Sequence, residues 1–293
     1  MKKTVLAAAI VLVAACAPKT SVLSPDGRIA VHFSLSASGI PSYSVDVDGQ
    51  PLLEPSVMGL VSDDVNLDRG FALKSSRIRN HQETWHQPWG ENKEVTDTHQ
   101  ELVLKLKNDA GVGLEVIFRV FDDGFGFRYA YAVPGADTLR INGERTQFAF
   151  ASDAETWSIP GDFNSYEHLY RHIPLSELRD ANTPLTLKFS DDLYAAVHEA
   201  ALVDFPEMVL RHDVGLTYQA SLAPLQQQRR RRGGLRRRRG QGPHLAKRWE
   251  PRGFSRVAAG FSCYDRGLQA SSCLLLIPGW MRDPPFSPGC ELC

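Results

Sequence analysis

The sequence predicts an all-β protein: a large antiparallel β-sandwich followed by a disordered tail. Three observations lead to this prediction. Apolar and polar residues alternate with period two in many short segments of the body. Turn sequences rich in Gly and Asp separate these segments. A body of about 200 residues is a usual size for one large sandwich.

The first strands are expected directly after the turn sequence Ser24-Pro25-Asp26-Gly27. A strand with one buried face places every second side chain in the core. This pattern is carried by Ile29, Val31, Phe33 and Leu35, and again by Tyr43, Val45 and Val47. The second run ends at Asp48-Gly49, which is a hairpin signal.

The later segments continue the pattern. Leucines alternate with polar residues at Leu102, Leu104 and Leu106. Residues 114–121 and 125–129 are expected to be strands on either side of the turn Asp122-Asp123-Gly124, and residues 185–189 and 193–197 to flank a hairpin turn at Ser190-Asp191-Asp192. The sequence favours a helix only around residues 175–180.

The N-terminus has the features of an export signal. Lys2 and Lys3 precede an apolar stretch, residues 5–13, that is too short to span a bilayer. Val13-Ala14-Ala15-Cys16 then resembles a lipobox, so residues 1–16 are expected to be a lipoprotein signal with Cys16 as the lipidation site. The alternative is an ordinary secretory signal that happens to end beside a cysteine.

Lipidation would decide where the protein resides. Each buried CH₂ of an acyl chain contributes about 0.8 kcal/mol, so two or three chains would hold the protein at a membrane. Ala17 follows the cysteine, and resemblance to Gram-negative sorting then favours the outer membrane or the periplasm. Residues 17–23 would be the tether.

Charge and cysteine divide the rest of the chain into two unlike parts. From Gln226 onward there are 14 Lys and Arg against four acidic residues, which leaves 19 basic and 30 acidic residues before it. Four of the five cysteines also lie in this tail, and the fifth is Cys16. Cys290 and Cys293 have C-x-x-C spacing, but no second pair or histidine cluster accompanies them, so we interpret the spacing as incidental.

Three interpretations of residues 225–293 remain open. An arginine-rich arm for nucleic acid conflicts with the export signal and has no aromatic residues among its arginines, so nucleic acid is not expected as a partner. The second interpretation is a genuine tail that is disordered. The third, which we favour, is a frameshift that replaces the natural continuation with out-of-frame residues.

The body also carries an ordered series of short motifs. Taken together, they resemble the N-terminal domain of glycoside hydrolase family 97. The matching segments are Ser24-Pro25-Asp26-Gly27, Gly39-Ile40-Pro41-Ser42-Tyr43, Pro55-Ser56-Val57-Met58-Gly59-Leu60, Glu83-Thr84-Trp85, Pro88-Trp89-Gly90-Glu91, residues 118–129, Trp157-Ser158-Ile159-Pro160-Gly161-Asp162, Tyr166-Glu167 and His198-Glu199-Ala200-Ala201-Leu202-Val203-Asp204.

The resemblance implies a fold and an activity. Residues 24–224 would form a super-sandwich of the galactose-mutarotase type, which in the family packs against a (β/α)₈ barrel. Members are exo-acting α-glucosidases or α-galactosidases that bind calcium and act on α-linked oligosaccharides. The barrel supplies the catalytic acid and base, so no catalytic residue is assigned here and the chain is expected to be inactive alone.

The resemblance also singles out site residues. Glu167 matches the carboxylate with which the sandwich reaches the calcium; the plain alternative is a solvated loop glutamate. One carboxylate is only a fragment of a calcium site, which takes six to eight oxygens. Trp85, Trp89 and Glu91 are candidates for sugar binding, although tryptophan in a sandwich more often belongs to the core. His198, Glu199 and Asp204 also look catalytic at first, but nothing in the sequence fixes a catalytic pair of carboxyls there, and Glu199 is interpreted as a structural or interface residue.

Two functions therefore compete. In the first, the chain is the truncated N-terminal domain of an α-glycosidase and contributes to carbohydrate and calcium binding. In the second, it is a stand-alone surface lipoprotein that binds glycans. The body contains no nucleotide-binding glycine motif, no HExxH and no GxSxG.

Overall fold

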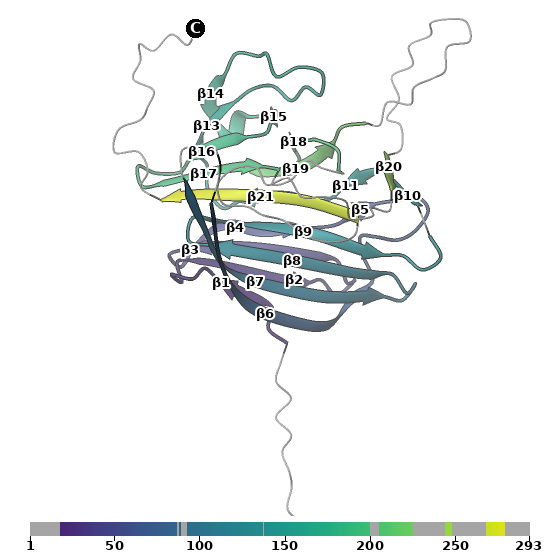
Figure 1. Cartoon of the computed structure of the whole chain (residues 1–293). Coiled ribbons are helices and arrows are strands. Elements are labelled where there is room, and N and C mark those ends of the chain that lie inside the picture. Colours follow the sequence, from purple (N-terminus) through teal and green to yellow (C-terminus); the bar gives the residue numbers. More distant parts are fainter. Residues whose placement is uncertain are drawn as a thin grey trace, which may run out of the picture.

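The computed structural model describes residues 18–86, 88, 93–136, 138–199, 205–224, 244–247 and 268–278. Nearly every regular element among them is a β-strand (Figure 1). No helix in this part of the chain is long and apolar enough to cross a bilayer. The predicted leader with Cys16 lies outside the described residues, as do Trp89, Glu91 and Asp204.

One antiparallel sheet contains eight strands. Their order across the sheet is β1-β2-β3-β4-β12-β19-β18-β15. Their bounds are β1 Ser21–Leu23, β2 Ile29–Leu35, β3 Pro41–Val47, β4 Gln50–Val57, β12 Gln147–Phe150, β15 Asp180–Asn182, β18 Met208–His212 and β19 Thr217–Leu222.

The second antiparallel sheet contains nine strands in the order β14-β13-β16-β17-β21-β9-β8-β7-β6. Their bounds are β6 Phe71–His86, β7 Glu94–Asn108, β8 Gly113–Phe121, β9 Gly124–Ala132, β13 Glu155–Ser158, β14 Arg171–Pro174, β16 Leu185–Lys188, β17 Leu193–His198 and β21 Leu268–Pro278. Two short strand pairs lie outside these sheets: β5 (Leu60–Val61) with β11 (Gly143–Glu144), and β10 (Thr138–Ile141) with β20 (His244–Lys247).

The core lies between the two large sheets. The fully buried ring of Tyr43, from β3, packs against three phenylalanines of the opposite sheet, with centroid distances of 6.1 Å to Phe118, 6.0 Å to Phe125 and 5.0 Å to Phe127. Tilted and edge-on aromatic pairs at these distances stabilise a core beyond their buried area. The described part of the chain is therefore a β-sandwich, as predicted.

The predicted period-two strands are confirmed. The alternating residues of β2 and β3 point into the core, and Ile29, Val31 and Phe33 are buried while Leu35 is partly buried. At the hairpin between β3 and β4, Asp48 and Gly49 have φ angles of 51° and 76°. Two consecutive left-handed residues are what a two-residue type I′ turn requires, which explains the Asp-Gly sequence.

The predicted helix at residues 175–180 is wrong. The structure has a single 3₁₀ turn, η1 (Leu175–Glu177), and the chain is extended again from Leu178. The buried hydroxyl of Tyr218 donates one hydrogen bond that is shared between the carbonyl oxygens of Leu175 and Leu178. This tertiary contact holds the segment as a single turn. A longer helix would have to break the contact.

Within residues 225–293, which were expected to form a disordered tail, two segments are the strands β20 and β21. β21 pairs with β17 on one side and with β9 on the other. Without β21, both neighbours would present unpaired backbone N–H and C=O groups, and an extended apolar segment can pair with both. The origin of the tail sequence stays a prediction.

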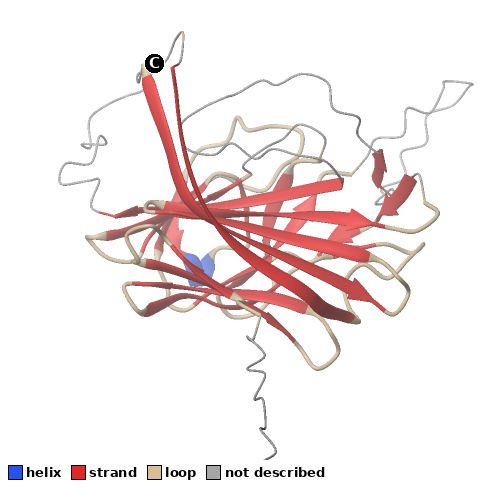
Figure 2. Cartoon of the chain, turned by 60° about the horizontal axis from the view of Figure 1, so that its bottom comes forward, coloured by secondary structure: helices blue, strands red, loops and turns tan. Residues whose placement is uncertain are grey.

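The hairpin of β6 and β7 is much longer than its neighbours. The two strands pair along their whole length, from Phe71 opposite Asn108 to His86 opposite Glu94, whereas β7 pairs with β8 only from Gln100 onward. The outer half of the hairpin therefore projects beyond the sheet, as Figure 2 shows.

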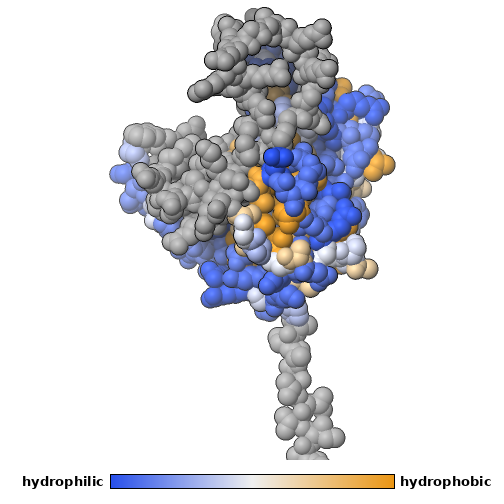
Figure 3. Space-filling model, turned by 90° about the vertical axis from the view of Figure 1, so that its right-hand side faces the viewer, coloured by the Kyte–Doolittle hydropathy of each residue, from blue (hydrophilic) through white to orange (hydrophobic). Residues whose placement is uncertain are grey.

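On the side seen in Figure 3, the coloured surface is mostly hydrophilic, and apolar side chains gather in one area. Five large apolar side chains stand out as exposed among the described residues. Three of these, Tyr166, Leu169 and Tyr170, lie on one loop, and Leu23 and Val214 lie elsewhere.

Candidate functional site

The loop that carries Glu167 connects β13 to β14 and is fastened at its base to β15. Gly161 N donates to Asp180 Oδ1 at 3.1 Å, and Asp162 N donates to Asn182 Oδ1 at 3.0 Å. A Cβ on Gly161 would lie 2.3 Å from Val209 Cγ1, so only glycine allows the loop to pack this closely. The loop therefore leaves the sandwich in a defined direction.

The middle of the loop is held by Asp162. Its Oδ1 accepts a bond from Asn164 N at 2.8 Å, and its Oδ2 lies 3.1 Å from His168 Nε2. The bond from Asn164, followed by the one from His168, lowers the pKa of the Asp162 carboxyl below its usual value. The ionised carboxylate thus braces the residues on both sides of Glu167.

Glu167 itself is exposed at the tip of the loop. Its backbone N–H donates to Ser165 Oγ at 3.0 Å. Its neighbours are also exposed, with 48% of Tyr166, 91% of Leu169 and 69% of Tyr170 accessible. An exposed carboxylate among exposed apolar side chains is suited to contact another protein surface.

The carboxylate of Glu167 is a hard oxygen ligand of the kind calcium takes. However, among the described residues no group of three possible metal ligands includes Glu167. A calcium ion at Glu167 would therefore need most of its six to eight oxygen ligands from elsewhere.

Tyr166 ties the loop to a second strand. Its hydroxyl donates to Glu207 Oε1 at 3.0 Å, directly before β18. Partial burial, and then the Glu207 carboxylate, raise the pKa of Tyr166 above its usual value. The phenol therefore stays protonated and remains a donor at physiological pH.

Glu199 has structural contacts. It accepts a hydrogen bond from Met208 N at 2.6 Å and another from the hydroxyl of Thr183. His198 Nδ1 lies 2.9 Å from the carbonyl oxygen of Glu199. These bonds join three segments of the sandwich and agree with the structural role expected of Glu199.

The three residues proposed for sugar binding are only partly located. Trp85 lies on β6, opposite Val95, in the projecting half of the hairpin, and is half-buried. Glu167 follows β13, and the loop ends at β14. β14 and β6 are the two end strands of the nine-stranded sheet. Trp85 and Glu167 therefore belong to opposite edges of this sheet. Sugar binding at Trp85 stays a prediction.

Comparison with known proteins decides the family. Residues 22–245 match the family model described as Glycosyl-hydrolase 97 N-terminal. This chain belongs to glycoside hydrolase family 97. The match covers both large sheets except β1's first residue and β21, and it confirms the resemblance found in the sequence.

Individual relatives agree with this family. The chain is 25% identical over 201 residues to a probable retaining alpha-galactosidase of Streptomyces bingchenggensis (strain BCW-1), which covers 68% of this chain and 31% of the relative. A family 97 enzyme from Pseudoalteromonas sp. strain K8, solved as an R171K variant, shows 26% identity and a TM-score of 0.68.

That structural match covers 87% of this chain and 35% of the enzyme. The same enzyme, with the same coverage, identity and TM-score, has been solved in complex with acarbose. A beta-arabinopyranosidase shares the fold, with a TM-score of 0.70 at 18% identity, and covers 87% of this chain and 40% of its own. This family 97 chain spans about a third of the length of its family relatives.

A buried carboxyl escaped the sequence analysis. Glu144, on β11, is 4% exposed and accepts a hydrogen bond from Thr146 Oγ1. Burial, together with the negative charge of Glu199, raises the pKa of Glu144 to about 7, although the Thr146 bond acts in the opposite direction. No sequence pattern marked this residue, because nothing in its neighbourhood in the chain shows that it is buried.

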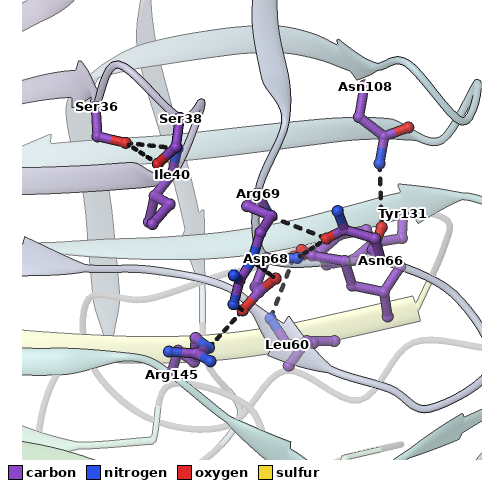
Figure 4. A network of polar contacts seen from close by, with 11 residues as sticks. Ser36, Ser38, Ile40, Leu60, Asn66, Asp68, Arg69, Asn108, Tyr131 and Arg145 are labelled. Atoms are coloured by element: carbon purple, nitrogen blue, oxygen red, sulfur yellow. Dashed lines mark hydrogen bonds and ion pairs between the residues drawn. The ribbon is translucent and has the colours of Figure 1, made fainter.

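A hollow of about 460 Å³ lies beside β5 and is lined by residues 60–69 and Arg145. Asp68 is among the lining residues, with Oδ1 3.0 Å from Arg69 Nε and Oδ2 2.5 Å from Arg145 Nε (Figure 4). Both cations thus share one carboxylate. This arrangement ties the loop to the strand that precedes Arg145, and we interpret it as structural.

Proposed function

We propose that this chain is the N-terminal sandwich of an exo-acting α-glycosidase, an α-glucosidase or α-galactosidase, and that Glu167 supplies one ligand to its calcium. The observation that carries the proposal is the exposed Glu167 carboxylate on a loop braced by Asp162 and Asn182. Two further facts support it: the family assignment and the exposed apolar side chains around Glu167.

The proposed role has a physical basis. Calcium needs six to eight oxygens, and a single carboxylate binds it weakly. A glutamate on a braced loop loses less backbone entropy than one on a mobile loop when the remaining ligands close around the ion. The apolar side chains beside Glu167 would at the same time be buried against the partner surface that carries those ligands.

The substrate class is part of the proposal. The Pseudoalteromonas enzyme has been solved with panose and with acarbose, and the Streptomyces relative is a probable retaining alpha-galactosidase. These relatives support α-linked oligosaccharides as the substrates of the complete enzyme. Its catalytic acid and base would belong to the barrel implied by the family.

The first test is to sequence the gene through the codons for residues 222–240 and translate all three downstream frames. We expect an open frame that encodes a barrel. The restored full-length enzyme should hydrolyse p-nitrophenyl α-glucoside or α-galactoside, and chelation should remove this activity. A set of closed frames would contradict the frameshift and favour a stand-alone protein.

The second test addresses Glu167 in the restored enzyme. E167Q should raise the free calcium needed for half-maximal hydrolysis by about tenfold or more, since it removes one charged ligand. E177Q is the matched control, because Glu177 is also an exposed glutamate near this end of the sandwich. An E167Q enzyme with an unchanged calcium requirement would refute the proposed role.

A stand-alone glycan-binding lipoprotein is the second candidate. One observation favours it: Trp85 is only partly buried on the projecting hairpin, and an accessible tryptophan face can stack on a sugar. Calorimetry of the chain with maltooligosaccharides and α-galactosides should then show binding that W85A weakens. The absence of heat with either class would exclude this function.

We also propose that Cys16 is acylated and anchors the chain at the outer membrane or in the periplasm. The lipobox-like sequence Val13-Ala14-Ala15-Cys16 supports this. Cells fed a labelled fatty acid should incorporate the label into the wild-type protein and not into C16S. Equal labelling of the two proteins would contradict the anchor.

A further inference from the structure

Two histidines and one aspartate meet on one face of the β6–β7 hairpin. His99 Nδ1 lies 2.5 Å from Asp97 Oδ1, and His81 Nε2 lies 3.9 Å from Asp97 Oδ2. One potential ligand atom from each of these side chains lies within 4.8 Å of the other two. No other described residues form such a group of three or more.

Strand register brings these residues together. His81 on β6 is directly opposite His99 on β7, and Glu83 is opposite Asp97. Residues two apart on a strand share a face, so the four side chains form a square on one side of the hairpin. The square lies where β8 ends and the hairpin begins to project.

Burial and packing preorganise two of the ligands. His99 and Asp97 have side chains that are 2% and 3% exposed. The ring of His99 stacks on that of His81 at a centroid distance of 4.6 Å and contacts Phe121 at 4.9 Å. The buried His99 ring, held in this way, cannot turn freely, so its Nδ1 remains directed at the Asp97 carboxylate.

The exposed side of the group is formed by His81 and Glu83. His81 is 42% exposed, and its Nε2 lies 3.7 Å from Glu83 Oε2. An ion could therefore enter past His81, and either Glu83 or a water molecule could complete its coordination. Sites with an entry path and an adjustable fourth ligand are common for tetrahedral Zn²⁺.

We propose that His81, Asp97 and His99 bind a divalent transition metal ion, and that Zn²⁺ is the ion of choice. Two imidazole nitrogens and a carboxylate oxygen form a donor set for zinc and its neighbours in the first transition row. Calcium prefers oxygen ligands only, so this site is chemically distinct from the proposed calcium ligand at Glu167.

Binding requires a small closure of the site. Zn–N and Zn–O bonds of about 2.0–2.2 Å place the ligand atoms of a tetrahedral site roughly 3.3 Å apart. His81 Nε2 and Asp97 Oδ2, at 3.9 Å, are farther apart than this value, whereas His99 Nδ1 and Asp97 Oδ1, at 2.5 Å, are closer together. Because His81 is the exposed member, a rotation of its side chain can shorten the first distance, and the hydrogen bond between His99 and Asp97 must open for both to bind the ion.

The test uses the full chain, stripped of metal with a chelator. Its thiols are alkylated beforehand, since the five cysteines of the sequence could also bind zinc. Calorimetric titration with Zn²⁺ should show one site per chain with an affinity of about micromolar or tighter. Co²⁺ should give the visible absorption of a site with nitrogen and oxygen ligands.

H81A is the decisive variant, because His81 is partly exposed and its loss should leave the fold intact. It should weaken Zn²⁺ binding by at least about tenfold. H32A is the matched control: His32 also lies beside an aspartate, with Nε2 3.2 Å from Asp46 Oδ2 and 40% of its side chain exposed. H32A should bind Zn²⁺ like the wild type.

D97N provides a second readout, since it removes the negative ligand and keeps the shape of the side chain. Once circular dichroism shows that D97N is folded, it should lose Zn²⁺ affinity at least as much as H81A. Equal affinities for the wild type and H81A, or no binding at about millimolar Zn²⁺, would overturn the proposal. Calcium should not compete with Zn²⁺ at this site. The zinc experiment therefore tests this proposal independently of the calcium experiment on Glu167.

Discussion

The hydroxyl of Tyr129 lies 2.7 Å from Thr146 Oγ1, and both residues are fully buried between the sheets. Thr146 donates its own proton to Glu144 Oε1, so Tyr129 must be the donor to Thr146. A chain of hydrogen bonds therefore leads from β9 to the carboxyl of Glu144. This arrangement gives the polar groups inside the core hydrogen-bond partners. It also makes the stability of the folded protein depend on the ionisation of Glu144.

The first prediction concerns this carboxyl. The pKa of Glu144 is raised from 4.5 to about 7 in the folded protein. The folded state binds the proton on Glu144 more tightly than the unfolded state does. The protonated carboxyl therefore contributes its full stabilisation below pH 4.5, and this contribution is lost as pH rises through 7. The free energy of unfolding should fall by up to about 3 kcal/mol across this range.

Urea unfolding at pH 5 and pH 8 measures the effect. E144Q, which has no titrating group at this position, should reduce the difference between the two pH values. E177Q serves as the control and should keep the wild-type difference. Equal pH dependence in the wild type and E144Q would show that Glu144 is not the group responsible.

The second prediction concerns Gly39, which has a φ of 69° in the turn before β3. A Cβ at this position would lie 2.4 Å from the backbone nitrogen of Phe71. G39A should therefore lose roughly 3 kcal/mol or more of unfolding free energy, from backbone strain and steric overlap together.

Gly49 provides the comparison for Gly39. Its φ of 76° is similar, but a Cβ added at Gly49 would have no other atom within 4 Å. G49A should lose only about 1–2 kcal/mol, the cost of the left-handed backbone. Thermal and urea unfolding would measure both variants, and similar losses would rule out the steric contribution at Gly39.

The third prediction concerns Tyr218, whose buried hydroxyl bonds the carbonyl oxygens that end the 3₁₀ turn. Y218F would leave both buried carbonyls without this donor. The unfolding free energy should fall by about 1–3 kcal/mol. Y170F removes a hydroxyl from an exposed ring and should be near neutral in the same urea titration. A stable Y218F would show that water or another donor replaces the hydroxyl.

The fourth prediction concerns the loop that carries Glu167. D162A removes the acceptor that Asn164 and His168 share, so amide hydrogens of residues 163–169 should exchange faster while the core strands keep their protection. Because the pKa of Asp162 is lowered, the bracing is present above about pH 4 and lost as pH falls further. D192A, at an exposed turn, is the control. Unchanged exchange in D162A would contradict the bracing role.

The strands were the most predictable part of the fold. Alternation at Ile29, Val31 and Phe33 depends only on which face of a strand is buried, and these side chains are in the core. The Asp48-Gly49 turn was predictable because few other residue pairs adopt two left-handed conformations in succession. Such signals are local, so they can be recognised without knowing which strands are paired.

The errors have physical causes. The segment at residues 175–180 resembled a helix locally, but the shared hydrogen bond from Tyr218, some 40 residues away, holds only one 3₁₀ turn. β21 lacks the expected alternation, yet it pairs with β17 and β9. Backbone pairing requires an extended chain and neighbouring strands whose N–H and C=O groups are still unpaired. Neither condition requires apolar and polar residues to alternate along the strand.

The candidate sites divide in the same way. Glu167 was found from a motif, and the structure places it on an exposed, braced loop. The group of His81, Asp97 and His99 was not found, because histidine and aspartate two residues apart are unremarkable in either strand alone. Their meeting depends on the register of β6 against β7.

By itself, the sequence determined the β-class of the chain, most of its strands and its membership of family 97. Those properties follow from local alternation, turn chemistry and short motifs. Only the tertiary structure decided the pairing of His81 with His99, the burial of Glu144 and the position of Trp85 and Glu167 at opposite ends of one sheet. Each of these depends on which strands lie side by side, and every strand offers the same backbone hydrogen bonds to any partner, so the choice is made by the packing of the whole core.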